Sequence, residues 1–390
     1  MRRPRSSPMA SMAARLVAGC CTALSLALLL GTRPAQAHVK WFAPYIVAAP
    51  QRPIAATLED GWFWLGCALV LFFFLAARMV EISRFGAPAL GLLDRITAPL
   101  WRRLDAYVRA IIGAFFVAIF AVGGIYLTPD LKTPHEWVSW IQLLIAAGVF
   151  FRRTMPLSAA GIVALWVLAV RDYGLFHLLD YLALGLATAA YLVLAASRQE
   201  AWRAHRFEVL RWGLAIALMW SSLEKFAYPD WFHPLVDEKP FLTLGLPRDA
   251  FIPMAGVAEF TLGFGLVWTP LIRRLSGAAL LVTFSAAVLP FGRIDLIGHG
   301  LIMAILAAVV AEQDRQPTPL ARWQEAIRQP LPGIPLGLGL ALVVFASCYT
   351  GLHGALYPAG SYPLPPPSER STHGFNPDHP HGPGMRSHRH

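Results

Sequence analysis

The chain has few charged residues for its length, and this scarcity excludes an ordinary soluble domain. Only 14% of its 390 residues are charged and 56% are hydrophobic, whereas soluble domains carry about 25% charged and about 45–50% apolar residues. No single soluble core could bury so large an apolar fraction. The composition therefore predicts a polytopic membrane protein.

Cysteine is also scarce, which excludes a disulfide framework. Cys20 and Cys21 fall in an N-terminal stretch that we expect to be removed, and Cys67 and Cys348 each lie in an apolar segment. We expect the last two to pack as small buried apolar residues. Cofactor motifs are lacking as well. Gly-x-Gly-x-x-Gly, Cys-x-x-Cys-His and paired interior histidines do not occur, so the sequence predicts no dinucleotide, flavin or haem site of its own.

Residues 1–37 have the pattern of a secretory signal peptide. A basic start precedes an apolar run over 16–30, and the small residues Ala35 and Ala37 stand just before His38. An uncleaved first transmembrane helix is the alternative. Five arginines of this stretch account for much of the formal charge of +10. Because most other arginines flank apolar runs, the basic charge indicates membrane topology, and we expect no nucleic-acid partner.

Ten further apolar runs have about the length that a helix needs to cross a bilayer, roughly 20 residues. They cover residues 60–79, 107–127, 136–151, 155–170, 176–196, 207–226, 250–270, 276–292, 296–312 and 334–357. Arginines gather after the first, third, fifth, seventh and ninth runs, as the positive-inside rule requires of cytoplasmic loops. The sequence therefore predicts an all-α helical bundle embedded in the lipid bilayer, with both mature termini outside.

The runs divide into a lead helix, two tandem four-helix units and a closing helix. The predicted segments are an outer segment with the lead helix and a basic cytoplasmic loop (38–106), a first unit (107–196), a second unit (207–312), the closing helix (334–357) and a disordered tail rich in proline and histidine (358–390). The second unit is longer than the first by a polar outer loop that follows Asp230.

Two sequence matches support a duplication of the four-helix unit. Arg171 and His177 stand six residues apart, as Arg293 and His299 do. Pro129-Asp130 recurs 100 residues later as Pro229-Asp230, and Gly113 and Tyr126 match Gly213 and Phe226 at the same offset. Only the second unit has Glu224, Lys225 and Glu259 in or beside apolar runs, so we expect any chemistry there.

Ionisable residues inside apolar runs are the strongest functional signal. A charge at the bilayer centre costs at least roughly 2.5–3.5 kcal/mol, so such groups usually face the bundle interior and find partners. Glu259 lies nearest the middle of its predicted helix, and Lys225, Arg293 and His299 are its candidate partners. Asp295 stands four residues before His299, so on a helix the two side chains share a face.

Two details refine this candidate site. Gly298 and Gly300 flank the histidine and would permit the close approach of a helix or a flat ligand. In the first unit, Asp172, Asp180 and Tyr173 are expected to serve Arg171 and His177 locally.

A purely structural interpretation competes with the functional one. Arg293 and Asp295 would then form an interfacial ion pair, His299 would bond to a backbone carbonyl, and Lys225 would neutralise Glu259 to fix helix packing. The first unit favours this interpretation, because it keeps an arginine and a histidine without a counterpart of Glu259.

The second unit resembles the DoxX family of small bacterial four-helix membrane proteins, and the first unit resembles it weakly. The segments that carry the resemblance are Ser222-Leu223-Glu224-Lys225-Phe226, Ala258-Glu259-Phe260, the double arginine Arg273-Arg274 and Asp295-Leu296-Ile297-Gly298-His299-Gly300. The resemblance implies a protein of the bacterial cytoplasmic (inner) membrane that is associated with redox chemistry, with its mature termini on the periplasmic side. Some relatives are quinone-linked subunits of a thiosulfate-oxidising enzyme or partners of oxidative-stress enzymes.

Carried over by position, the resemblance assigns Glu259, His299 and Asp295 as catalytic residues. We place Lys225, Glu224, Arg293 and Trp220 around them as ligand-binding residues. The electron carrier would be a diffusible quinone or would belong to a redox or stress-response protein partner.

Two alternatives remain at the level of sequence. A mature chain that begins with His38 offers an amino group and an imidazole from one residue, a chelate suited to copper. His373, His379 and His381 in the tail are further candidate ligands for copper or zinc. The other alternative is a membrane scaffold without catalysis, whose tryptophans near the ends of the apolar runs act as interface anchors.

Overall fold

The computed structural model describes residues 47–243, 245–313 and 330–358. The predicted signal peptide and most of the predicted tail lie outside these residues. The described part is 82% helical, with 14 α-helices and no strand. Its only β-type contact is an isolated bridge between Ile125 and Lys132. The predicted all-α fold is therefore confirmed.

All ten predicted apolar runs are helical. The helices are α3 (Ile54–Leu58), α4 (Gly61–Ile82), α5 (Gly86–Trp101), α6 (Leu104–Val122), α7 (Glu136–Gly148), α8 (Met155–Tyr173), α9 (Leu175–Ala196), α10 (Glu200–Ala204), α11 (Arg206–Ser222), α12 (Glu224–Ala227), α13 (His233–Glu238), α14 (Arg248–Gly265), α15 (Pro270–Ala311) and α17 (Pro330–Leu356). Two 3₁₀ turns, η1 (Pro229–Trp231) and η2 (Pro240–Thr243), flank α13. Helix α15 contains two of the runs, which meet at a kink where Gly292 has φ 75° and ψ −154°.

Six helical segments are long and apolar enough to cross a membrane. They are Gly61–Ile82, Leu104–Val122, Met155–Tyr173, Leu175–Ala196, Pro270–Leu289 and Gly333–Leu356. Helix α7 has 13 residues, about 20 Å at 1.5 Å per residue, which is less than the roughly 30 Å of the hydrocarbon core. The described helices thus support a multi-pass membrane protein with spans of unequal length.

Large apolar side chains point outward along these helices. Phe72, Leu144 and Leu289 are 73%, 71% and 87% exposed. Soluble monomers rarely expose apolar side chains over such an extent, so a lipid environment explains them. Cys67 is half-buried, but Cys348 is exposed on α17. The prediction that both cysteines are buried is therefore wrong for Cys348, because the closing helix buries little of its surface.

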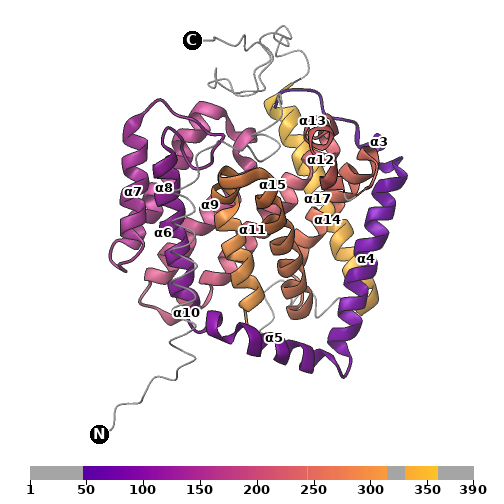
Figure 1. Ribbon diagram of the computed structural model, residues 1–390, viewed down its shortest axis with the longest axis horizontal. Helices are drawn as coiled ribbons and strands as arrows, with labels where there is room; N and C mark the ends of the chain where they lie inside the picture. Colours follow the sequence, from indigo (N-terminus) through magenta and orange to yellow (C-terminus); the bar gives the residue numbers. More distant parts are fainter. Residues whose placement is uncertain (1–46, 244, 314–329, 359–390) are drawn as a thin grey trace.

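The first unit lies on one side of the bundle, and the second unit extends from its centre to the other side. Figure 1 shows α6 to α9 on one side, α4, α14 and α17 on the other, and α11 and α15 between them. Helix α5 runs across one end of the bundle, and α12 and α13 lie with α3 at the opposite end. We call these the α5 end and the α13 end. The positive-inside rule predicts that the α5 end is cytoplasmic.

Helix α5 corrects the prediction of a basic cytoplasmic loop. With 16 residues it is shorter than a bilayer crossing, so a search for spans passes over it. Arg274, which sequence reasoning assigned to topology alone, is 3% exposed and pairs with Asp94 of α5. Its Nη2 also donates to Thr97 Oγ1 at 2.9 Å. The arginine therefore fixes α5 across the end of the bundle.

A second buried arginine cluster ties α15 to α11 near the same end. Arg211 and Arg273 are each 3% exposed. Both pair with Glu312, and the Arg273 Nη1 to Glu312 Oε2 distance is 3.2 Å. These arginines therefore serve packing as well as topology.

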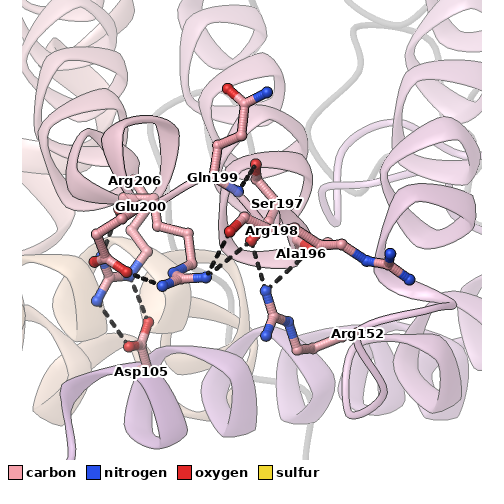
Figure 2. Close-up of polar contacts among 9 residues, drawn as sticks. Asp105, Arg152, Ala196, Ser197, Arg198, Gln199, Glu200 and Arg206 are labelled. Atoms are coloured by element: carbon pink, nitrogen blue, oxygen red, sulfur yellow. Dashed lines mark hydrogen bonds and ion pairs between the residues drawn. The ribbon is translucent and has the colours of Figure 1, made fainter.

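Arginines make polar contacts around α10, the short helix that connects the two units (Figure 2). Arg206 at the start of α11 donates two hydrogen bonds of 2.8 Å to the carboxylate of Asp105 in the first turn of α6. Arg152, in the connection between α7 and α8, donates to the carbonyl oxygens of Ala196 and Ser197 at the end of α9. Arg206 thus ties the second unit to the first, while Arg152 ties the connection between α7 and α8 to the end of α9.

The units meet most extensively where α9 packs against α11. A Cβ at Gly213 would lie 2.1 Å from Ala187 Cβ and 2.8 Å from the carbonyl oxygen of Ala183. Only glycine lets the two helices approach this closely. Its sequence counterpart Gly113 instead lies against Phe150 within the first unit. The matched glycines therefore have different neighbours.

The structure also changes how the two units align. Gly174 (φ 82°) and Gly292 (φ 75°) each join the third and fourth helices of a unit. Arg171 precedes its junction glycine and Arg293 follows the other, so the two arginines are not equivalent. Aligning the glycines places Asp295 opposite His177. The paired motifs in the sequence are thus offset by four residues, because spacing alone does not show where a helix turns.

The same alignment is found where the second and third helices of each unit meet. A Cβ at Gly148 would lie 2.2 Å from Ser158 Oγ, and a Cβ at Gly265 would lie 2.2 Å from Ser276 Oγ. A glycine against a serine therefore holds each helical hairpin together, at nearly the same offset as the junction glycines.

We expect Gly213→Ala to destabilise the contact between the units, since overpacking costs typically about 1–3 kcal/mol. The apparent melting temperature of the detergent-purified variant should fall by several degrees. Gly339→Ala in α17 is the matched control, because nothing lies within 4 Å of a Cβ there. Equal melting temperatures for the two variants would contradict the close approach of α9 and α11.

Candidate functional site

Glu259 is paired inside the second unit. Its Oε2 lies 2.5 Å from Lys225 Nζ, and Ser221 Oγ donates to its Oε1 at 3.4 Å. The Glu259 side chain is 22% exposed and the Lys225 side chain 17%. The Lys225 ammonium also lies 5.0 Å from the centre of the Phe232 ring. Three segments, α11, α12 and α14, therefore position the carboxylate.

A break between α11 and α12 brings Lys225 to Glu259. Helix α11 ends at Ser222, and the short α12 begins at Glu224, where the sequence predicted one continuous run. On α14, a Cβ at Gly256 would lie 3.0 Å from Lys225 Cβ and 2.8 Å from the Phe226 ring. The glycine one turn before Glu259 thus leaves room for the lysine beside α14.

Asp295 and His299 form the second ionisable pair. His299 Nδ1 lies 2.8 Å from Asp295 Oδ1, so the two side chains share a helix face as predicted. Asp295 is 1% exposed, and the His299 ring lies 4.8 Å from the Phe284 ring. The carboxylate can hold the imidazole in one orientation and tune it as a proton carrier. At Gly300 nothing lies within 4 Å of a Cβ, so no helix of the described residues packs closely there, and the approach of a flat ligand stays a prediction.

Glu259 and His299 line one cavity between the two units, which we call the inter-unit cavity. Its volume is about 90 Å³, and it is open on one side. Most of its walls are apolar side chains of α6, α8, α9, α11 and α15. The polar residues that line it are Thr128, Asp180, Tyr181, Thr188, Ser221, Glu259 and His299. Both units therefore contribute to the site.

Two polar atoms of this lining have no hydrogen-bond partner within the described part of the chain. They are Nε1 of Trp166 and Oγ1 of Thr128, and their residues are 4% and 8% exposed. Buried donors are nearly always satisfied, by protein, water or ligand. Neither atom has a surface open to the cavity, and Trp166 Nε1 packs against Gly185 of α9, so a bound acceptor would reach them only if the wall of the cavity shifted.

The structure brings some predicted site residues together and separates others. Lys225 reaches the inter-unit cavity through Glu259, and Asp295 reaches it through His299. Trp220, Glu224 and Arg293 do not line it. Trp220 packs instead against Phe176 and Tyr349, Glu224 is buried in α12, and Arg293 is exposed.

Asp180 belongs to the cavity although the sequence assigned it to a local role. It is 6% exposed on α9 and lines the cavity from the first unit. It could have been found by the criterion that singled out Glu259, an acid within a long apolar helix. Thr128, Thr188 and Ser221 gave no such signal, because neutral polar residues are common in membrane helices.

The arginine and histidine of the first unit have separate partners, away from the pair Glu259 and His299. Arg171 Nε donates to Asp172 Oδ1 at 2.7 Å, as expected. His177 Nε2 lies 3.6 Å from Asp130 Oδ2. Tyr126, in the connection after α6, donates its hydroxyl to Asp172. Burial and this hydrogen bond raise the pKa of the Tyr126 phenol.

The proposed metal ligands cannot be placed. His38, His373, His379 and His381 lie outside the described residues. Among residues 47–243, 245–313 and 330–358, no group of three or more histidine, cysteine, aspartate or glutamate side chains could hold a metal ion. Copper or zinc binding by the N-terminal histidine or the tail stays a prediction.

No protein-family model matches the chain, and no curated protein or solved structure matches it either. The resemblance of residues 207–312 to the DoxX family therefore stays a prediction from the quoted motifs.

We expect substitutions of Lys225 and Glu259 to be non-additive. Lys225→Met leaves a carboxylate without its cation, and Glu259→Gln leaves an ammonium without its anion, in a largely apolar setting. The double variant loses both charges together, so the coupling should reach about 0.5–3 kcal/mol. Melting temperatures of the single and double variants in detergent measure it. Strict additivity would show that the pair contributes nothing to stability.

Proposed function

We propose that this membrane protein binds the head group of a quinone in the inter-unit cavity and exchanges protons with it through Glu259 and His299. The observation that carries the proposal is that these two ionisable side chains line one mostly apolar cavity, in whose wall the Nε1 of Trp166 is a buried donor. A quinone ring is flat and apolar, and its two carbonyl oxygens accept hydrogen bonds. Ligand sites in proteins commonly combine apolar walls with a few placed polar groups in this way.

The volume limits how much of the molecule enters. A cavity of about 90 Å³ is smaller than the 150 Å³ cavity that encloses benzene in an engineered protein. The cavity therefore accepts the carbonyl-bearing edge of the ring, while the rest of the ring and the isoprenoid tail stay at its open side. A larger, fully enclosed cofactor does not fit.

The protein would handle protons and a partner would handle electrons. Converting a quinone to a quinol takes two electrons and two protons, and the sequence has no cofactor motif of its own. A redox protein partner would supply or accept the electrons, which agrees with the role implied by the DoxX resemblance. The Asp295 carboxylate orients the His299 ring, and His299 and Glu259 are the two ionisable groups of the cavity that would exchange protons with the quinone.

We expect Glu259→Gln to weaken quinone binding at least tenfold. The cavity loses a carboxylate, and the side chain at position 259 is no longer held in place by its ion pair with Lys225. Titration of the detergent-purified protein with a short-chain ubiquinone analogue measures the dissociation constant. Glu208→Gln on α11 is the matched control: Glu208 is 21% exposed and pairs with His205 at 3.0 Å near the opposite end. Unchanged binding in Glu259→Gln would remove the proposed site, whereas equal losses in both variants would indicate a general effect on folding.

Trp166→Phe tests the unpartnered donor with little change in volume. A hydrogen bond contributes about 0.5–1.5 kcal/mol, so binding of the same analogue should weaken about two- to tenfold. Trp212→Phe is the control, because Trp212 is partly buried on α11 and does not line the cavity. If Trp166→Phe binds as tightly as the control, a carbonyl oxygen does not accept from Nε1.

A further inference from the structure

A second, more polar cavity lies at the α13 end. Its volume is about 650 Å³, and it is lined by the segment before α3, by α12 with η1, and by the start of α14. We call it the vestibule. Its charged and titratable lining residues are Arg52, Asp60, Lys225, Asp230, His233 and Asp249. The Asp230 side chain is 87% exposed, so water reaches this cavity.

The vestibule and the inter-unit cavity meet at one ion pair. Lys225 lines the vestibule and does not line the inter-unit cavity, whereas Glu259 lines the inter-unit cavity and does not line the vestibule. The two side chains touch at 2.5 Å. Ser221, the other partner of Glu259, lies on the inter-unit side. The two partners of one ion pair therefore line two different spaces, one polar and one mostly apolar.

The surroundings of the pair make it a narrow boundary. Gly256 lies against Lys225 Cβ and the Phe226 ring, and the Phe232 ring lies under the lysine ammonium. Phe226 is itself packed against Phe63 of α4, with ring centres 5.6 Å apart. Aromatic rings thus surround the lysine, and the ion pair is the polar route between the two cavities.

We propose that the vestibule is the aqueous entrance to the inter-unit cavity and that the pair of Lys225 and Glu259 closes it. Protons from the α13 side reach the site by this route. The proton-supply role deepens the proposed function and rests on it, while the closed entrance is a property of the structure alone.

The proton step involves only this pair and water. A hydronium ion in the vestibule gives its proton to a Glu259 carboxylate oxygen and leaves as water. Lys225 keeps its own proton, and the ion pair opens because one partner is now neutral. The Glu259 carboxyl can then give the proton to an oxygen of the bound quinone as electrons from the redox partner reduce it, after which the carboxylate pairs with Lys225 again. If the α13 end is periplasmic, as the arginines predict, quinone reduction at this site would draw protons from the periplasm.

Thiol labelling of the full-length protein in proteoliposomes tests the closure. All four native cysteines are replaced by serine, and Ser221→Cys places a thiol on the inter-unit side. A charged, membrane-impermeant methanethiosulfonate reagent is added to vesicles in which the α13 end faces outward. We expect slow modification while the pair is intact and modification at least tenfold faster when Lys225→Ala is added. Lys225→Arg, which keeps a cation beside Glu259, should stay slow.

Two controls keep the result interpretable. Arg248→Ala breaks an exposed ion pair with Asp237 at the same end and should leave the Ser221→Cys rate unchanged. Asp230→Cys, in the exposed wall of the vestibule, should react quickly in every background and so reports that the reagent and the fold are intact.

Two results would overturn the proposal. One is a Ser221→Cys thiol that reacts as fast as Asp230→Cys while the pair is intact, and the other is a rate that Lys225→Ala does not change. Labelling does not depend on quinone. Labelling that is slow with the pair intact and faster in Lys225→Ala, together with no quinone binding, would reject the proposed function and keep the entrance. Quinone binding together with a rate that Lys225→Ala does not change would keep the proposed function and reject the entrance.

Discussion

The structure depends on one constraint: an ionisable side chain inside a membrane bundle must find a partner within the bundle. The ionisable side chains that hold the bundle together pair either with another helix or with the next turn of their own helix. Glu259 joins α14 to α12, Asp295 holds His299 on α15, and Arg274 fixes α5 across the end of the bundle. Burying a charged group costs desolvation free energy unless its partner is in place. Only one alignment of the two helices pairs the charges, so the pair fixes how far one helix is shifted along the other. The same constraint concentrates chemistry at the few places where a charged pair is only partly satisfied by protein.

Close helix packing makes the interface between the units a site. Gly213 lets α9 and α11 touch, so the two units share one core and do not lie apart as independent bundles. Where the helices diverge from this contact, the inter-unit cavity opens, and acids from both sides enter it. The asymmetry of the units follows. The first contributes Asp180 and the unpartnered donor of Trp166, while the second contributes the ion pair and the histidine, and neither unit could form the cavity alone.

Sequence reasoning predicted the helices well because bilayer thickness imposes a length that can be read from hydropathy. It also found Glu259, Lys225 and the Asp295 and His299 pair, since charges in apolar runs are rare and a spacing of four residues implies one helix face. It failed where contacts between segments distant in the sequence determine the structure. Helix α5 is too short to register as a span, and the register of the two units depends on the backbone turn at Gly292. Asp180 was assigned to a neighbour in sequence, but its helix turns it toward the other unit.

The difference between the two cavities argues for the direction of access. Lys225 lies between a polar cavity of several hundred cubic ångströms and a small apolar one. Burying this lysine costs free energy that an apolar residue would avoid, so stability alone does not explain its position. The ion pair reduces that cost only while Glu259 is charged. Protonation of the carboxyl removes the attraction, and Lys225 then gains more from the water of the vestibule than from the apolar side. The pair is therefore stable in one protonation state and open in the other. This is the property that a proton entrance needs, and a packing contact between aliphatic side chains cannot have it.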